Sequence, residues 1–463
     1  MENKERVTPP LLENVKSQLE NYSKKVADHT FKITVVTPMV GGSAQAGKIN
    51  DSDPIRISTI RGHLRFWWRA TRGASFENVY DLRKRESEIF GDTKLPSKVK
   101  LWIEYINRSS STNAKVKKQN KKGKWRNKIK SEYSDYALFS LNEDNNAKVL
   151  IHCKFELYLQ YIDVDKREMD EEILPALWAW MNFGGVGART RRGCGSLYCN
   201  HDQFTPSISD QVKTYESWYK YKQQKYKLKL NYEAKEWPTL PPDIIAKNST
   251  GNAIQVWKEV VEIYKSFRSK KPPKGRRSAW PEADAIRHIT QMSATKHETP
   301  VPKEKGTCIA FPRAEFGMPI LFHYKWIASR DHSREPYTLQ LVPEDKNRLA
   351  SPIITKVMAT SEKTGVGIIV RLNQPKPVNL ELRIVDSEAT ELEKKRINEL
   401  ISKFPLTQEY IYQQLRYPHN PFMKYGKVSS TNSATQAFLQ SEEVQRWKQG
   451  SRMNHSSPKT KKN

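Results

Sequence analysis

The alternation of strand-like and helix-like segments in residues 27–204 is the feature that most constrains how this chain can fold. Strand-like segments are short apolar or alternating runs, and helix-like segments have apolar residues at helical spacing. The segments are, in order, residues 31–36, 60–72, 98–106, 149–159, 171–183 and 195–199. The order strand, helix, strand, strand, helix, strand predicts a ferredoxin-like, RRM-like α+β domain over residues 27–205.

The length of 463 residues calls for at least one further domain, because a single compact core rarely grows so large. Strand-like runs and a helix that ends before Pro405 predict a second α+β domain over residues 286–425. Residues 206–285 form a basic and aromatic linker region with one amphipathic helix at 253–268, whose apolar face is expected to pack. We expect residues 1–26 to be an N-terminal extension and the polar residues 426–463 to be a disordered tail.

Charge narrows the classes of partner. Lys and Arg (79) outnumber Asp and Glu (51), which gives a net charge of +28. Such an excess favours a large anionic partner, and nucleic acid is the first candidate. The polar start of the chain and the lack of a long apolar run lead us to expect neither a signal peptide nor a membrane span, and four cysteines are too few for a disulfide framework. We therefore expect a cytoplasmic protein without a membrane partner.

Four arginines recur at helical spacing in the segment 60–72. Arg61, Arg65, Arg69 and Arg72 are separated by 4, 4 and 3 positions, which places them on one stripe of a helix. Like charges at this spacing repel, so the stripe needs a polyanion or acidic neighbours. We favour RNA phosphates. The alternative is an internal salt-bridge network, with Glu86 and Glu88 as candidate partners.

A glycine-rich, arginine-rich loop at residues 183–196 is the most specific local feature. It contains five glycines together with Arg189, Arg191 and Arg192. Glycines allow a backbone to approach a ligand closely, and guanidinium groups donate charge-assisted hydrogen bonds to phosphate. The loop is therefore predicted to clamp an RNA backbone; a purely structural turn would need fewer glycines.

A basic insertion occupies residues 108–130, which contain ten Lys or Arg residues and no acidic residue. This composition predicts a mobile arm between two strands that contacts phosphate, and Trp125 favours binding. The alternative is a solvated loop that only keeps the chain soluble.

Enzymatic chemistry has little support in the sequence. Residues 42–48 match part of a P-loop, but Ile49 stands where Ser or Thr should hold magnesium, so only an RNA contact by Lys48 is retained. Cys194, Cys199 and His201 lack a fourth ligand for zinc, and we predict no metal and no cofactor. His63 could serve as a general base in metal-independent RNA cleavage, with Lys48 or Tyr80 as helpers.

Several motifs together resemble the RAMP superfamily of CRISPR proteins, and within it the first-subunit family of the type III-B, or Cmr, effector complex. They are Thr37-Pro38 with Gly41-Gly42, the helix at 57–70 with its Arg-Phe-Trp-Trp-Arg run, residues 88–91, the glycine loop, and the later segments 279–287, 311–320 and 348–353. The helix and glycine loop are shared by many RAMP proteins. The Arg-Phe-Trp-Trp-Arg run with the later segments indicates the subunit family.

The resemblance implies two tandem ferredoxin-like domains and a non-catalytic subunit that binds the 3′ part of a guide RNA and helps it capture target RNA for antiviral defence. Its partners would be both RNAs and the other Cmr subunits, one of which would carry the nuclease. The predicted RNA-binding residues are Lys48, Arg56, Arg61, Arg65, Arg69, Arg72, Gly184, Gly185, Gly187, Arg189, Arg191, Arg192, Gly193, Arg287, Arg313 and Arg348. The alternative function is a metal-independent endoribonuclease that processes CRISPR repeat RNA, because some RAMP relatives cleave such RNA.

Overall fold

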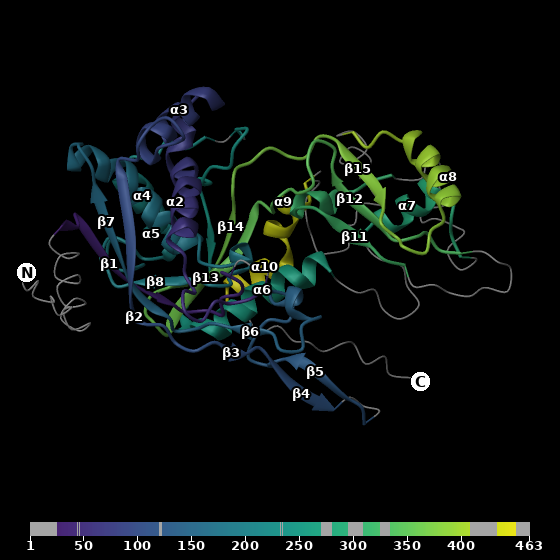
Figure 1. Ribbon diagram of the computed structural model, residues 1–463, viewed down its shortest axis with the longest axis horizontal. Coiled ribbons are helices and arrows are strands. Elements are labelled where there is room, and N and C mark those ends of the chain that lie inside the picture. Colours follow the sequence, from purple (N-terminus) through teal and green to yellow (C-terminus); the bar gives the residue numbers. More distant parts are fainter. Residues whose placement is uncertain are drawn as a thin grey trace, which may run out of the picture.

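The computed structural model contains three sheets of three or more strands, arranged along the long axis of the molecule (Figure 1). It describes residues 26–43, 45, 47–119, 123–231, 233, 235–269, 280–294, 309–324, 334–407 and 433–450. None of the helices in these ranges is long and apolar enough to cross a membrane.

The first sheet has the strand order β2-β7-β1-β8, and its neighbouring strands are antiparallel. Its strands are β1 (His29–Val35), β2 (Val99–Asn107), β7 (Lys154–Tyr161) and β8 (Leu197–Cys199). Helix α2 (Ile57–Arg72) lies between β1 and β2 in the chain, and α4 (Lys166–Phe183) lies between β7 and β8. This is the order of elements that the sequence predicts for residues 27–205. Alternate residues of β1 and β7 form the core, with Phe31 opposite Leu157 and Ile33 opposite Phe155.

Two helices outside that order pack beside this unit. Helix α3 (Val79–Phe90) follows α2 and is N-capped by Asn78, whose side chain accepts a hydrogen bond from Asp81. Helix α5 (Tyr215–Lys225) begins with a Thr214–Ser217 capping box, and its buried aromatic Tyr219 stacks on Trp178 of α4.

The second half of the chain forms two sheets rather than one. One sheet contains β13 (Ile353–Ala359) and β14 (Thr364–Arg371), with β14 also pairing with the short strands β9 (Ile245–Ala246) and β10 (Gly251–Asn252). Helix α6 (Ala253–Arg268) follows β10 and carries the buried apolar face predicted for residues 253–268. The other sheet has the order β11-β12-β15. Its strands are β11 (Ile320–Phe322), β12 (Leu339–Pro343) and β15 (Leu380–Ile384), and the helices α7 (Glu282–Thr290) and α8 (Glu391–Ser402) accompany it.

This arrangement corrects the boundaries expected for a single domain over residues 286–425. The described strands of that range split between the two sheets, and β14, the partner of β13, also pairs with β9 and β10, which precede residue 286. The physical reason is that β-pairing is not local: the β11-β12-β15 sheet has its own apolar core, built around Phe311, Leu339 and Leu341. Residues 408–425 lie outside the described residues.

The expected disordered tail is wrong for residues 433–450, which form α9 (Ala434–Gln440) and α10 (Glu442–Lys448). Phe438 and Trp447 are 0% and 1% exposed and belong to the same core as α6. Two buried aromatic side chains stabilise this segment sufficiently to order a polar stretch.

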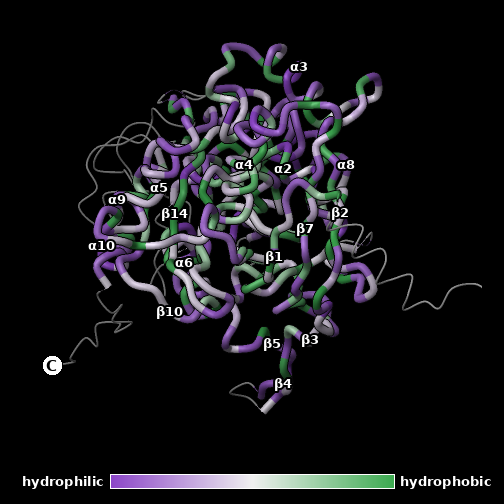
Figure 2. Tube along the Cα trace, turned by 90° about the vertical axis from the view of Figure 1, so that its left-hand side faces the viewer, coloured by the Kyte–Doolittle hydropathy of each residue, from purple (hydrophilic) through white to green (hydrophobic). Residues whose placement is uncertain are grey.

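The basic insertion also departs from the expected mobile arm. Its described residues form an antiparallel hairpin of β4 (Lys115–Gln119) and β5 (Trp125–Ile129), and its base is held by the pairing of β3 (Thr112–Asn113) with β6 (Lys148–Val149). The hairpin projects away from the rest of the described chain, as both views show (Figures 1 and 2). The buried apolar residues Ala114, just before β4, and Ile129, at the end of β5, anchor the base of the hairpin despite the charge of its strands.

A buried joint connects the first unit with the β13-β14 sheet. The core of the first unit continues into Ile354, Met358 and Ile368. The indole nitrogen of Trp257 on α6 donates to the carbonyl of Arg192 at 2.7 Å, and the fully buried Lys356 donates from Nζ to the carbonyl of Gly184 at 2.6 Å. Gly193 is required here because it has φ +69° and a Cβ would lie 2.6 Å from the Trp257 ring.

Burial lowers the pKa of Lys356 to about 7 in the folded chain, from 10.5. Between these two pH values the unfolded chain holds a proton that the folded chain lacks, so the free energy of unfolding rises with pH in this window. We expect the wild-type value minus the Lys356→Met value to rise by about 1.4 kcal/mol per pH unit between pH 7.5 and pH 9.5, measured by urea unfolding. Lys363→Met, at an exposed lysine, is the control and should give no such slope. Parallel pH profiles for wild type and Lys356→Met would contradict this assignment.

Candidate functional site

The arginine stripe of α2 is largely paired inside the molecule. Arg65 Nε and one guanidinium nitrogen of Arg69 each lie 2.6 Å from the same oxygen of Glu86, whose side chain is buried. Arg65 also donates to the carbonyl of Gly91 at 3.1 Å, and Arg61 donates to the carbonyl of Phe90. A buried carboxylate needs such partners, because an unpaired charge in the interior is costly. Arg65 and Arg69 therefore belong to an internal salt-bridge network. This network connects α3 to α2.

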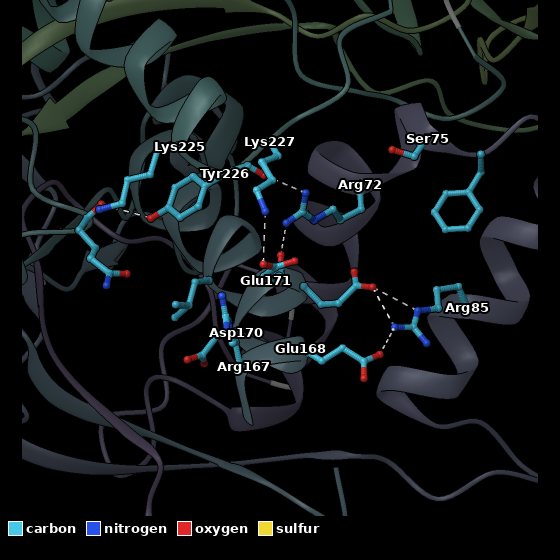
Figure 3. Close-up of a pocket in the computed structure, with 14 residues that line it drawn as sticks. Arg72, Ser75, Arg85, Arg167, Glu168, Asp170, Glu171, Lys225, Tyr226 and Lys227 are labelled. Carbon is cyan, nitrogen blue, oxygen red and sulfur yellow. Dashed lines mark hydrogen bonds and ion pairs between the residues drawn. The ribbon is translucent and has the colours of Figure 1, made fainter. Parts of the chain in front are cut away.

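Glu88, the other acidic partner expected for the arginine stripe, has a different role. Glu88 pairs with Arg85, at 3.2 Å, and not with the stripe. Arg85 also contacts Glu168 and Glu172 of α4, at 3.2 and 3.0 Å (Figure 3). These ion pairs join α3 to α4.

Arg72 points into a separate hollow of about 500 Å³ (Figure 3). Its guanidinium group donates to the carbonyls of Tyr226, at 2.9 Å, and Glu171, and burial lowers its pKa. The walls of this hollow carry both signs of charge, from Arg72, Arg85, Arg167, Lys225 and Lys227 and from Glu168, Asp170, Glu171 and Glu172. The acidic side chains make it a poor site for phosphate.

The glycines of the loop at 183–196 serve packing against protein backbone. Gly195 has φ +61°, and a Cβ there would lie 2.0 Å from the carbonyl oxygen of Val186. The backbone N–H groups of three of these glycines donate to backbone carbonyls: Gly195 to Pro38 at 3.0 Å, Gly193 to Thr190 at 2.9 Å and Gly184 to Trp180 at 2.9 Å. These backbone donors are occupied, so the prediction of a backbone cradle for a ligand is wrong at Gly184, Gly193 and Gly195. Gly185 and Gly187 lie in the same packed segment, where Gly187 approaches Val40.

The loop arginines reach across the joint. Arg192, 8% exposed, donates to the carbonyl of Ile353 on β13 at 2.6 Å and to the Tyr264 hydroxyl on α6 at 2.7 Å. Its guanidinium carbon also lies 3.9 Å from the centre of the Tyr264 ring. Arg191 donates to the carbonyl of Ser351, and Arg189 donates to that of Tyr136 at 2.9 Å. Carbonyls and aromatic rings therefore position these cations while leaving their charge uncompensated.

A hollow of about 370 Å³ opens beside these arginines, and we call it the arginine-lined hollow. Four cations, Arg189, Arg191, Arg192 and Arg268, line it, and none of the described residues that line it is acidic. The other residues that line it are Tyr136, Thr190, Tyr264, Phe316, Gly317, Met318, Pro319, Leu349, Ala350 and Ser351. Within the described ranges no carboxylate lies within ion-pair distance of any of the four arginines, nor of the exposed Arg348 beside Leu349.

Burial and repulsion from neighbouring cations lower the pKa of Arg189 and Arg191 in the arginine-lined hollow. Burial, and secondarily the charge of Arg192, lowers the pKa of Arg191 to about 10, so Arg191 stays protonated at neutral pH. Burial also lowers the pKa of Arg189. An anion would relieve both effects, because it would supply the opposite charge that the hollow lacks.

The remaining predicted residues are scattered. Arg287 pairs with Asp284 and Glu335, each at 2.7 Å, and Arg313 pairs with Glu282 at 3.1 Å. Lys48 pairs with Asp144 at 2.7 Å. Arg56 is exposed at the N-cap of α2. The structure thus brings together Arg189, Arg191 and Arg192 but not the stripe of α2, and Arg348 is an exposed residue next in sequence to Leu349, which lines the hollow.

Arg268 was missed as a site residue because it ends the amphipathic helix α6, where a basic residue is ordinary helix capping. Nothing in the sequence connects Arg268 with the glycine loop 75 positions earlier. Only the fold shows that Arg268 and the loop arginines line the same hollow.

The residues of the alternative nuclease site are not assembled. The Nε2 atom of His63 is buried without a hydrogen-bond partner among the described residues, and burial lowers its pKa. Tyr80 is 75% exposed, Lys48 is held by Asp144, and neither forms a described hydrogen bond with His63. Cys153, Cys194 and Cys199 are buried free thiols, and no group of His, Cys, Asp or Glu in the described ranges could hold a metal ion.

Two curated proteins and two solved structures are similar to this chain. Cmr subunit Cmr1-2 of the CRISPR system of Pyrococcus furiosus is 29% identical over 184 residues, which cover 36% of this chain and 92% of that protein. Cmr1-1 of the same organism is 29% identical over 149 residues, which cover 31% of this chain and 40% of that protein. A crystal structure of Cmr1 from Pyrococcus furiosus in its apo form matches with a TM-score of 0.43 at 16% identity, covering 81% of this chain and 95% of that chain. A cryo-EM structure of type III-B Cmr-beta bound to cognate target RNA has a chain that matches with a TM-score of 0.42 at 12% identity. The match covers 80% of this chain and 99% of that chain.

A family model agrees with these sequence matches. The model of the RAMP superfamily matches residues 32–198, a range that runs from β1 to β8 and includes the glycine loop. Residues 32–198 therefore resemble the RAMP superfamily, and the chain is similar in sequence to Cmr1 subunits of CRISPR systems.

Proposed function

We propose that this chain is a non-catalytic RNA-binding subunit of a type III-B CRISPR ribonucleoprotein complex. It helps hold the 3′ part of the guide RNA and capture target RNA, together with other Cmr subunits, one of which carries the nuclease. The observation that carries the proposal is the arginine-lined hollow, where four cations converge and no acidic side chain is present. The sequence similarity to Cmr1 subunits supports the same assignment.

Phosphate binding suits the chemistry of this hollow. Arg189, Arg191 and Arg192 are held in place by carbonyls and a phenol, so little side-chain entropy is lost when a phosphate binds. Guanidinium contacts to phosphate oxygens hold the backbone of a strand and carry no sequence information. In an RNA-guided complex this is sufficient, because base pairing between guide and target supplies sequence specificity.

The proposal revises the set of RNA-contacting residues. Arg189, Arg191, Arg268 and Arg348 are the candidates, with Arg192 as the residue that holds the loop to the second unit. Arg65, Arg69, Arg287 and Arg313 are assigned to internal ion pairs, since each lies within 3.2 Å of a carboxylate oxygen. We also propose that the β9-β10-α6-β13-β14 segment with α9 and α10 is the second ferredoxin-like unit, which the β11-β12-β15 sheet interrupts.

Replacing Arg189 and Arg191 together by Gln should weaken binding of single-stranded RNA and flatten its salt dependence. If each arginine contacts one phosphate, the slope of log K against log salt should fall in magnitude by about 1.4, because each contact contributes roughly 0.7. Fluorescence anisotropy with a labelled single strand at several salt concentrations measures both quantities.

The matched control removes two exposed charges elsewhere, with Arg83→Gln and Lys84→Gln on α3. This variant has the same net charge as the Arg189 and Arg191 variant but should keep the wild-type slope. Equal slopes for all three proteins would reject the arginine-lined hollow as the RNA site.

The alternative function, cleavage of repeat RNA, would require His63 to reach a substrate hydroxyl. Because its Nε2 atom is enclosed, we expect purified protein and repeat RNA in a chelator to give no defined fragments between pH 6 and pH 8. Gel electrophoresis of end-labelled RNA measures this. Fragments that disappear in the His63→Ala variant would establish the nuclease instead.

A further inference from the structure

The β4-β5 hairpin presents an exposed indole among cations, and the proposed function above leaves this surface unused. Trp125 is 62% exposed, although tryptophan is usually among the more buried residue types. The hairpin register places Gln119 opposite Trp125 and Lys117 opposite Asn127. Side chains alternate along a strand, so Lys117, Trp125 and Asn127 share one face.

This face borders a hollow of about 650 Å³, lined by Lys117, Trp125, Arg126, Asn127 and Asn145. The side-chain amide of Asn127 donates to Asn145 at 3.1 Å, which connects the hairpin to the turn before β6. In the described part of the chain, no acidic residue lines this hollow. Within the described ranges neither Lys117 nor Arg126 has a carboxylate within ion-pair distance, so both cations are available to a ligand.

The hairpin is held at its base, so the strand that carries Trp125 is positioned before a ligand binds. Lys115 is buried and donates from Nζ to the carbonyls of Asn142 and Asp144, at 2.8 and 2.7 Å. Ala114 and Ile129 are buried in the core that also contains α6. A ligand that binds the projecting strands therefore need not order the hairpin first, which lowers the entropic cost of binding.

The neighbours of Trp125 favour nucleic acid over protein as the ligand. A tryptophan that anchors a protein interface is usually found in an apolar, desolvated centre. Here its neighbours in the hollow are a lysine, an arginine and two asparagines. This set matches an unpaired nucleotide, in which a base stacks on an aromatic ring, amides meet base edges and cations meet phosphates.

We propose that this face is a second RNA-binding site, distinct from the arginine-lined hollow. It takes an unpaired stretch of RNA with one base stacked on Trp125 and one phosphate at Lys117. A neighbouring phosphate is at Arg126, which lies on the opposite face of the hairpin but lines the same hollow. The inference rests on the proposed function, in that it requires the chain to bind RNA, but it names a surface that the arginine-lined hollow does not include.

The two parts of the site have different signatures in a salt titration. Trp125→Ala in the full chain should weaken binding of labelled oligouridine about tenfold without changing the salt slope, because an uncharged ring displaces no counterions. Trp125→Phe should restore most of the affinity. Lys117→Ala with Arg126→Ala should reduce the magnitude of the slope by about 1.4. Phe139→Ala, at an aromatic residue that is 65% exposed, is the matched control and should bind like wild type.

A second measurement places the base. Oligouridine that carries 5-iodouracil, irradiated in complex with the chain, should crosslink to the peptide that contains Trp125, and mass spectrometry identifies that peptide. Absence of that crosslink from a complex that has formed would count against stacking.

The outcomes separate this inference from the proposed function. If Trp125→Ala binds RNA like wild type while the Arg189 and Arg191 variant is weakened, the hairpin site is overturned and the proposed function stands. If Trp125→Ala keeps RNA binding but loses the other subunits on co-purification, the hairpin is a protein contact and the inference is overturned. If the wild-type chain does not bind RNA at all, both are rejected.

Discussion

Cations buried in the joint between the first unit and the β13-β14 sheet constrain the rest of the structure. Arg192 and Lys356 are taken out of water there, and their partners are carbonyls and a phenol rather than carboxylates. Removing a charge from water is costly, and only fixed dipoles and ring contacts offset that cost here. The glycine loop therefore cannot shift relative to the second unit without leaving these groups unsatisfied. The arginine-lined hollow is fixed by the same contacts that join the two units.

Arginine thus has two separate roles in one chain, and the deciding factor is the nearest carboxylate. On α2, Glu86 neutralises Arg65 and Arg69 and turns a cationic stripe into a fastening for α3. At the joint no described carboxylate lines the hollow or lies within ion-pair distance of its arginines, so the positive potential extends into the hollow. The net charge of +28 predicts an anionic partner for the whole molecule. It does not predict which arginines meet that partner, because this depends on pairing.

Sequence reasoning succeeded where the signal was local and failed where it depended on distant pairing. Helices α2, α4 and α6 and the strands of the first sheet follow from periodicities that lie within each segment. Strand β13 was missed, because Lys356 in its middle looks like a surface residue although it is buried. The hairpin was predicted to be mobile because ten cations hide the two apolar residues that anchor its base. Glu86 could be named as a partner of the stripe, but only the packing of α3 decides between it and RNA.

The two proposed RNA sites recognise different parts of a nucleotide, and neither depends on which base is present. Guanidinium groups in the hollow meet phosphate oxygens, which are the same at every position of a strand. An indole stacks on the face of a base, and every base has such a face. A guide RNA must vary in sequence to match many targets, so a protein that held it through base-edge contacts would restrict the targets available. Contacts to phosphates and ring faces hold the strand while leaving its pairing edges free for the target.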